Sequence, residues 1–334
     1  MKKIAVVLLN MGGPDSIEAL EPFLRNLFSD PDIFKIPVAQ KFFAKIIARK
    51  RAPKVAKEYE LIGGKSPINE WTELQRQMLE EELRANFYSG NTPKETGFDS
   101  AKTDVFVAMR YWKPFTDVTA EKVAKGNYDK VILLPLYPHY SITTSGSSFN
   151  EWSRVYKGDT SKVEVIRNYF DHPTYIKALN ERIDEALLKW SEEKRGGVNI
   201  LFSAHGTPVS LVKNGDPYSK EIKVTMEEVM KQRGYSHKYH LSFQSKVGPV
   251  KWLTPATDVK LMELGAAGVK DVLVVPISFV SDHVETSFEL DIEYRHNAEE
   301  AKIENYIVMT GLNDSKTFVK CLAELVTQRL KTEG

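Results

Sequence analysis

The sequence contains a single cysteine, Cys321. One cysteine excludes an intramolecular disulfide, a cysteine-rich zinc module and a cluster held by several cysteines of this chain. It fits a reducing compartment, but secreted proteins without disulfides have the same composition. The sequence also has almost no excess of one charge over the other. The formal net charge is +1, which argues against a dedicated nucleic-acid binder.

Long hydrophobic runs are absent as well. No apolar stretch approaches the roughly 20 residues needed to span a bilayer. Lys2 and Lys3 precede an apolar run over residues 4–9, which is too short for a signal peptide and has no small-residue cleavage site behind it. We therefore predict a first β-strand there. Because no transit segment precedes this strand, we expect a bacterial cytoplasm.

Common nucleotide motifs are missing. The Gly-Gly-Lys-Ser stretch at residues 63–66 resembles the tail of a P-loop, but Tyr59 stands in place of its first glycine and Pro67 follows. Residues 10–13 do not form a G-x-G-x-x-G motif, and the sequence has no G-x-S-x-G nucleophile elbow. These absences weigh against NTP binding, dinucleotide binding and α/β-hydrolase chemistry.

Short apolar runs alternate with amphipathic segments, a pattern typical of βα units and parallel sheets. A length of 334 residues favours two domains. We expect residues 1–165 and 166–314 to form them, with the C-terminal helix (about 315–334) packing back onto the first. Asp171 is predicted to cap a helix that starts at Pro173, and residues 89–102 to form a surface loop. Strands are predicted over residues 4–9, 104–109, 130–136, 198–203, 238–243, 271–277 and 305–309.

Ligands of open α/β sheets bind beyond the carboxyl ends of the strands. Six predicted strands are followed there by aromatic, His, Arg, Ser or carboxylate side chains with Gly or Pro nearby. Together they predict a cleft for a large, flat, mostly apolar ligand. Each alone is an ordinary loop signal.

Two groups near these strand ends are candidates for chemistry. His205 can take a proton near neutral pH and can coordinate Fe²⁺, although a lone histidine after a strand is often structural. Its neighbour Gly206 would let a bulky ligand approach the backbone. Read as a helix, the segment that follows Asp282 and His283 carries Glu285, Glu289 and Glu293 four residues apart. This stripe is either a solvated helix face or a carboxylate line that passes protons or metal ions.

A basic amphipathic segment lies at Pro37–Lys54. Its apolar positions are Val38, Phe42, Phe43, Ile46 and Ile47, and its cations are Lys41, Lys45, Arg49, Lys50, Arg51 and Lys54. Such a helix can lie on an anionic membrane surface, or it can face a core with its basic side solvated. The sequence leaves both interpretations open.

Five motifs resemble those of the ferrochelatases, in the same order along the chain. They are Leu-Asn-Met-Gly-Gly-Pro at 9–14, Ile-Gly-Gly-Lys-Ser-Pro at 62–67, Ser-Ala-His-Gly at 203–206, Phe-Gln-Ser-Lys-Val-Gly-Pro at 243–249 and Ser-Asp-His-Val-Glu at 281–285. The resemblance implies an α/β fold of two similar Rossmann-like lobes, each with a parallel sheet flanked by helices, and a porphyrin cleft between them. It also implies that the enzyme inserts Fe²⁺ into protoporphyrin IX, forming protoheme and releasing two protons in the last step of heme biosynthesis.

The resemblance also assigns roles to individual residues. His205 and Glu285 are implied to face each other across the macrocycle and to carry metal binding and proton abstraction. Asp282, His283, Glu289 and Glu293 match an acidic path that leads away from the pocket. The positions that match porphyrin-binding residues are Met11, Arg51, Tyr59, Ser66, Arg110, Tyr137 and Trp252.

The sequence departs from part of the family. Ile142 stands where some relatives have cysteine, and a C-terminal extension with further cysteines is absent, so we predict no iron–sulfur cluster and no required cofactor. Residues 213–218 and 137–146 resemble protoporphyrin-type rather than coproporphyrin-type enzymes. The expected partners are protoporphyrin IX, ferrous iron, other heme-pathway proteins and, through residues 37–54, the inner membrane surface. The alternatives are a non-catalytic tetrapyrrole or metal carrier, or a chelatase for another metal or for coproporphyrin.

Overall fold

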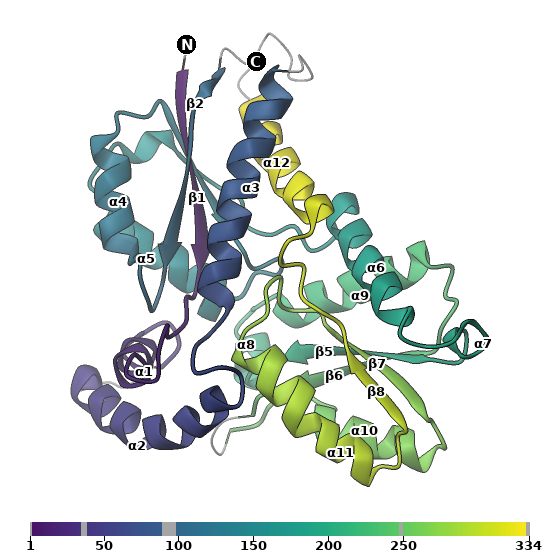
Figure 1. The fold of residues 1–334 in the computed structure, drawn as a ribbon. Helices are drawn as coiled ribbons and strands as arrows, with labels where there is room; N and C mark the ends of the chain where they lie inside the picture. The colour runs from purple at the N-terminus through teal and green to yellow at the C-terminus, as the bar shows by residue number, and fades with distance from the viewer. Residues whose placement is uncertain (1, 35–38, 89–97, 247–249, 332–334) are drawn as a thin grey trace. The chain divides into compact units, whose positions relative to one another are not determined.

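A computed structural model describes residues 2–34, 39–88, 98–246 and 250–331. The chain divides into two compact units. The first unit contains residues 1–169 and 313–334, and the second contains residues 170–312. Each unit is built around its own four-stranded parallel sheet (Figure 1).

The first unit has a sheet of strand order β2-β1-β3-β4. All its strand pairs are parallel. The alternate residues Ala5, Val7 and Leu9 of β1 pack against α4 and α5 on one face. Helices α3 and α12 lie side by side on the other (Figure 1). The elements are β1 (Lys2–Asn10), α1 (Leu20–Phe28), α2 (Gln40–Glu60), α3 (Ile68–Tyr88), β2 (Phe98–Met109), α4 (Thr116–Lys125), β3 (Lys130–Pro135), η2 (Ile142–Gly146), α5 (Ser147–Val155), η3 (Thr160–Lys162), β4 (Val163–Val165) and α12 (Lys316–Lys331).

The second unit repeats this topology with the strand order β6-β5-β7-β8, again all parallel. Leu201, Val272 and Val274 pack against α10, η4 and α11, while α6 and α9 pack together and α6 also contacts β7. The elements are α6 (Pro173–Leu187), α7 (Glu192–Arg195), β5 (Asn199–His205), α8 (Val209–Lys213), α9 (Tyr218–Gln232), β6 (Tyr239–Gln244), α10 (Thr257–Ala266), β7 (Asp271–Pro276), η4 (Glu285–Glu293), α11 (Tyr294–Glu300) and β8 (Asn305–Val308).

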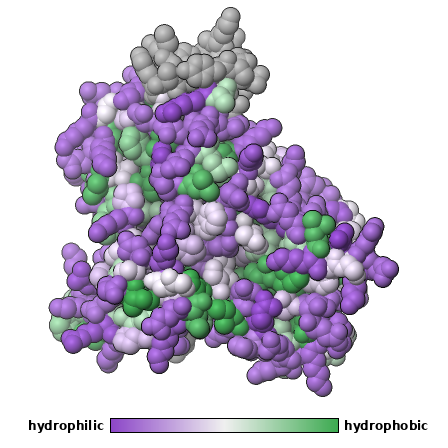
Figure 2. Space-filling view, in the orientation of Figure 1, coloured by the Kyte–Doolittle hydropathy of each residue, from purple (hydrophilic) through white to green (hydrophobic). Residues whose placement is uncertain are grey.

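The predicted fold class is therefore confirmed: two similar units, each a parallel sheet flanked by helices. Central strands such as β3 are buried at every position, as expected for strands covered on both faces. The face drawn in Figure 2 is mostly hydrophilic, with hydrophobic residues in small separate groups.

Three local predictions differ from the structure. Residues 98–102 belong to strand β2 rather than to a loop, while residues 89–97 of that predicted loop lie outside the described residues. The cap of α6 is His172, one residue after Asp171, because Pro173 already occupies the first helical position. Strand β4 has three residues, too few to produce a periodic pattern in the sequence.

Candidate active site

The candidate site lies at the carboxyl end of β5. This strand ends at His205, and the next strand beside it, β7, leads through a short loop to Glu285. The chain passes from β5 to β6 on one side and then to β7 on the other. The ends of β5 and β7 therefore mark the point where the strand order reverses, where open α/β sheets bind their ligands.

His205 and Glu285 are in direct contact. The His205 Nδ1 atom lies 2.8 Å from Oε2 of Glu285. The backbone of His205 is fixed on both sides, because its N–H donates to Ser278 Oγ and its carbonyl accepts from the Tyr218 hydroxyl. The side chains remain 39% and 21% exposed, so the pair is accessible to solvent.

This contact corrects one prediction. The resemblance implied that His205 and Glu285 face each other across the macrocycle. A ring between them would need about 3.5 Å of clearance on each face. A separation of 2.8 Å leaves no room for it, so the two side chains form one hydrogen-bonded pair instead.

The acidic segment after β7 is a π-helix, η4, rather than a regular α-helix. Wide helical turns of this kind often occur at functional sites. Glu285 and Glu289 both reach the hydroxyl of Ser245, at 3.0 and 2.5 Å. Glu293 is exposed. The predicted stripe therefore consists of a clustered pair and a third, solvated carboxylate.

The other two residues of the predicted path have different surroundings. His283 is 3% exposed, and its ring centroid lies 4.2 Å from that of Phe279. Its Nε2 atom is 3.9 Å from Glu285 Oε1. Asp282 instead accepts a hydrogen bond from the backbone N–H of Gly311. The structure thus brings His283, Glu285 and Glu289 near His205.

The charges in this cluster shift one another's ionisation. Burial lowers the pKa of His205, but the Glu285 carboxylate raises it above its usual value overall. Burial would raise the pKa of Glu285, but the charge and hydrogen bond of His205 lower it to about 2. Burial and the charge of Glu285 raise the pKa of Glu289 to about 7. Burial lowers the pKa of His283.

Gly206 has a different role from the one that the sequence suggested. A Cβ atom at this position would lie 2.5 Å from the carbonyl oxygen of Gln244 and 3.4 Å from Cε3 of Trp252. The glycine therefore allows close approach of the Gln244 backbone. Trp252 packs beside it, and its strand-like bridge to Pro208 holds it near the end of β5.

Two residues of the site were missed in the sequence analysis. Ser245 follows β6 directly, and its backbone N–H and hydroxyl contact the glutamates. The Gln244 side chain accepts from Ser203 Oγ and donates to Glu285. Their position just after a strand was the available signal, but serine and glutamine have no distinctive chemistry at such a position.

The remaining predicted porphyrin-binding residues all belong to the first unit. Met11 follows β1 and packs in the cluster around α1 and α2, whereas Arg51 is exposed on α2 with its guanidinium 5.7 Å from the Phe28 ring centre. Tyr59 and Ser66 are each 3% exposed. Tyr137 lies just beyond β3, and burial raises its pKa.

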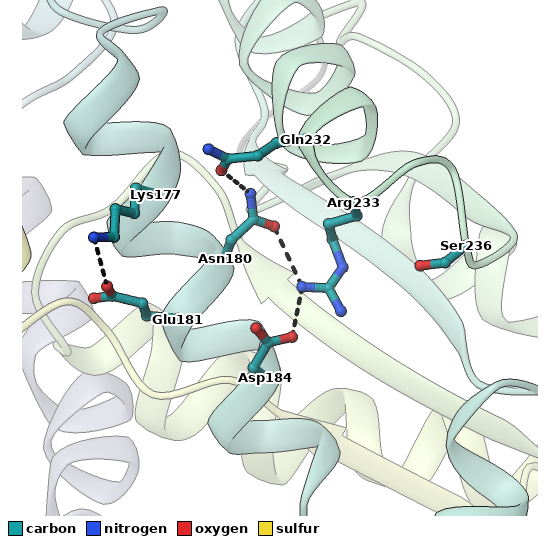
Figure 3. A pocket seen from close by; sticks show the side chains of 7 residues that line it. All are labelled: Lys177, Asn180, Glu181, Asp184, Gln232, Arg233 and Ser236. Carbon is teal, nitrogen blue, oxygen red and sulfur yellow. Dashed lines mark hydrogen bonds and ion pairs between the residues drawn. The ribbon is translucent and has the colours of Figure 1, made fainter.

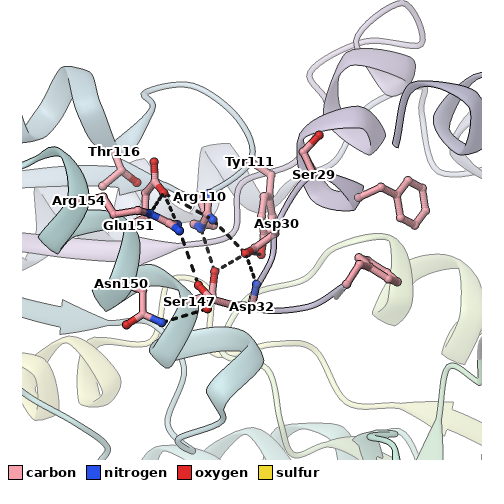
Figure 4. A network of polar contacts seen from close by, with 12 residues as sticks. Ser29, Asp30, Asp32, Arg110, Tyr111, Thr116, Ser147, Asn150, Glu151 and Arg154 are labelled. Carbon is pink, nitrogen blue, oxygen red and sulfur yellow. Dashed lines mark hydrogen bonds and ion pairs between the residues drawn. The ribbon is translucent and has the colours of Figure 1, made fainter. Parts of the chain in front are cut away.

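Arg110 belongs to a buried polar network (Figure 4). Its Nη2 atom is 3.1 Å from Oδ1 of Asp30, and its Nε donates to Ser147 Oγ. The same Asp30 carboxylate accepts from the hydroxyls of Tyr111 and Ser147. The aspartate is fully buried, so these donors compensate its desolvation and hold the arginine in one orientation.

A separate polar groove of about 460 Å³ lies between α6 and the C-terminal end of α9 (Figure 3). Some of its side chains bond to one another: Arg233 Nη1 lies 2.7 Å from Asp184, and Asn180 donates to Gln232. It includes none of the predicted site residues. Its lining is Lys177, Asn180, Glu181, Asp184, Gln232, Arg233 and Ser236.

Helix α2 presents apolar side chains to solvent. Phe42, Phe43 and Ile46 are 62%, 44% and 38% exposed. The helix packs on the α1 cluster through Ala44 and Ala48 instead. Pro37 and Val38 of the predicted amphipathic segment lie outside the described residues. None of the described helices combines the length and the hydropathy that a membrane span requires.

Comparison with known proteins gives consistent matches along the chain. A family model described as Ferrochelatase matches residues 3–330. The Ferrochelatase of Geotalea daltonii is 48% identical over 337 residues, covering 100% of this chain and 99% of that protein. The Ferrochelatase of Gloeobacter violaceus is 42% identical over 337 residues, covering 99% and 98%. Among solved structures, the sirohydrochlorin chelatase SirB from Bacillus subtilis, in complex with cobalt, has a TM-score of 0.49 at 10% sequence identity. The match covers 99% of this chain and 97% of that protein.

Proposed function

The chain belongs to the ferrochelatase family, enzymes that insert a metal ion into a porphyrin, and on this premise we propose that it inserts Fe²⁺ into protoporphyrin IX. The products are protoheme and two protons. The observation that carries the proposal is the contact of 2.8 Å between His205 and Glu285 at the reversal point of the second sheet. An imidazole beside a carboxylate can both bind ferrous iron and accept protons.

Metal insertion must remove two pyrrole protons and present nitrogen lone pairs to the metal. Those lone pairs point into the plane of a flat ring. Binding energy from the porphyrin periphery can tilt the pyrroles, a distortion of about 1–5 kcal/mol. Seven residues are proposed to make the peripheral contacts: Met11, Arg51, Tyr59, Ser66, Arg110, Tyr137 and Trp252.

The two central side chains suit different tasks. The Glu285 carboxylate raises the pKa of His205, which makes the neutral imidazole a stronger base for pyrrole protons. Glu285, whose pKa lies at about 2, stays anionic and can offer its oxygens to Fe²⁺. We assign proton abstraction mainly to His205 and metal binding to both.

Protons released at this pair need a route to solvent. Glu289 accepts the hydrogen bonds of Ser245 beside Glu285, and Glu293 is exposed one helical turn further along η4. We propose that Asp282, His283, Glu289 and Glu293 carry protons outward or metal ions inward. The raised pKa of Glu289, about 7, suits reversible protonation near neutral pH.

We also propose that α2 contacts an anionic membrane surface. Phe42, Phe43 and Ile46 are exposed, and lysines and arginines lie among them on the same helix. Exposed aromatic groups flanked by cations favour the interface between lipid headgroups and acyl chains. A porphyrin is poorly soluble in water, so contact with a membrane would bring the enzyme near its substrate.

One experiment tests the main proposal. The pure protein is mixed anaerobically with protoporphyrin IX and Fe²⁺, with Zn²⁺ as a second metal, and the visible spectrum is followed. We expect many metalloporphyrin molecules per protein. A spectral shift that stops at one equivalent would instead indicate a tetrapyrrole or metal carrier. Faster turnover with coproporphyrin than with protoporphyrin would reassign the substrate.

A further inference from the structure

Ser245 has an unusual backbone conformation. Its φ is +65°, in the left-handed region that residues with a side chain rarely adopt. It lies immediately after β6, at the same edge of the sheet as His205. Such conformations persist only where the surrounding structure stabilises them, and they concentrate at functional sites.

The contacts of Ser245 explain what this conformation achieves. Its backbone N–H donates to Glu289 Oε1 at 2.8 Å, and its hydroxyl lies 2.5 Å from Oε2 of the same carboxylate. Rotation about the N–Cα bond sets the side-chain direction relative to the N–H, so φ decides whether both donors reach one carboxylate. The hydroxyl is also 3.0 Å from Glu285 Oε2.

Two carboxylates therefore meet at one serine. Like charges this close repel each other, so Glu285 and Glu289 need donors between them to remain side by side. Gln244 Nε2 is a second donor to Glu285, at 3.4 Å, but it does not reach Glu289 in the described contacts. Among the described residues, Ser245 alone makes hydrogen-bonding contacts with both glutamates. Its backbone N–H donates to Glu289, and its hydroxyl, which carries one hydrogen, lies within hydrogen-bonding distance of both carboxylates.

We propose that Ser245 is a positioning residue that holds Glu285 against His205 and Glu289 beside Glu285. The inference rests on the proposed function, since these are the groups assigned to the metal ion and the protons. Without the Ser245 hydroxyl, the carboxylates separate and the metal site loses its geometry. We expect porphyrin binding to remain unchanged, because the contacts of this hydroxyl are with the two carboxylates.

Three substitutions at this position distinguish the contribution of the hydroxyl from that of the backbone conformation. Ser245→Ala removes the hydroxyl and keeps the strained φ, Ser245→Gly removes both, and Ser245→Thr keeps the hydroxyl. Lys302→Gly is the matched control, because Lys302 is exposed in the same unit with a φ of +60°. Steady-state rates, separate KM values for metal and porphyrin, and Tm are measured for each.

We expect kcat/KM for the metal to fall about 10–100-fold in both Ser245→Ala and Ser245→Gly, the usual effect of losing a group that orients a metal ligand. The porphyrin KM stays unchanged. Glycine also relieves the backbone, so the Tm of Ser245→Gly exceeds that of Ser245→Ala. Ser245→Thr recovers most of the activity per folded molecule, and Lys302→Gly keeps full activity.

Binding of Co²⁺ without porphyrin, followed by visible absorption, gives a readout independent of turnover. We expect about tenfold weaker binding in the alanine and glycine variants and wild-type binding in the threonine variant. If wild-type protein does not turn over but this pattern holds, the proposed function fails and the inference stands. Alanine and glycine variants that match wild type in both assays overturn the inference, as does activity that only follows Tm. Wild-type protein that neither turns over nor binds Co²⁺ overturns both.

Discussion

The His205 Nδ1 atom is hydrogen-bonded to Glu285 Oε2 at 2.8 Å, although 80 positions separate the two residues in the chain. The contact leaves the other ring nitrogen, Nε2, without a partner among the residues that the structure describes. In a histidine that binds metal or moves protons, the bond at one nitrogen fixes the orientation of the other. The pair therefore presents an oriented imidazole nitrogen and a carboxylate at the end of β5.

Substitution of either member of this pair tests its role. We expect His205→Ala and Glu285→Gln each to lower kcat by about 10²–10⁴-fold, because general acid–base groups contribute effects of that size. Circular dichroism and Tm should stay close to wild type. The surface pair His296 and Glu299, 3.4 Å apart, provides matched controls. Near-normal rates in both central variants would refute the assignment.

The pKa of Glu289 predicts a specific pH dependence of stability. Its folded-state pKa is about 7, above the usual 4.5. The folded protein therefore holds this proton more tightly than the unfolded chain, and stability is lost as the pH rises from about 4.5 to 7. The Glu289→Gln variant is neutral at every pH. Its free energy of unfolding relative to wild type should therefore increase by about 1–3 kcal/mol as the pH rises over that interval, and should not increase further above it.

Urea unfolding at several pH values between 4.5 and 8 measures this difference. Glu300→Gln is the control, because Glu300 is an exposed carboxylate of the same unit, and its difference from wild type should change little over this interval. If the difference between Glu289→Gln and wild type stays flat with pH, Glu289 does not titrate as proposed.

Two glycines predict different effects of the same substitution. In Gly206→Ala the new Cβ would lie 2.5 Å from the Gln244 carbonyl, so stability should fall by about 1–3 kcal/mol and activity should fall with it. In Gly265→Ala the Cβ would lie 2.0 Å from the carbonyl of Ala301. Gly265 and Ala301 lie at the C-terminal ends of α10 and α11, opposite the edge of the sheet where the strands end.

Chemical denaturation and kcat per folded molecule distinguish the two variants. Gly265→Ala should lose stability and keep its kcat, since its clash is remote from His205. Equal loss of kcat in both variants would show that the close approach at Gly206 is unrelated to the site.

The exposed aromatic side chains of α2 predict binding to anionic lipid. Phe42→Asp combined with Phe43→Asp should abolish co-sedimentation with vesicles that contain phosphatidylserine, because it removes the apolar contact and reduces the positive charge. Val259→Asp, at an apolar position 47% exposed on α10, is the control and should bind like wild type. Salt should weaken wild-type binding. Equal binding of the double variant and wild type would show that α2 does not mediate membrane binding.

Much of the fold follows from the sequence because its signals are local. The continuous apolar runs that become β1, β3, β5 and β7 predict buried parallel strands without knowledge of their partners. Strand β4 and the start of β2 have no such signal. Residues 163–165 are strand only because β3 pairs with them.

The carboxyl-end rule also places His205 and Glu285, from chain order alone, at the edge of the sheet where open α/β folds bind ligands. It cannot give their separation, which depends on the strand register and on the loop after β7. For the same reason their direct contact could not be anticipated from the sequence. The exposure of Phe42 likewise depends on which face of α2 packs against α1.

The alternation of strands and helices, the family and the residue types that follow each strand can be inferred from the sequence alone, because they depend on neighbours in the chain. Tertiary packing was needed to show that His205 bonds directly to Glu285 and that Ser245 contacts two glutamates. It also decided that Gly206 makes room for its own backbone. Such contacts join segments about 40–80 residues apart, and their distances are fixed by packing and register, which no local pattern encodes.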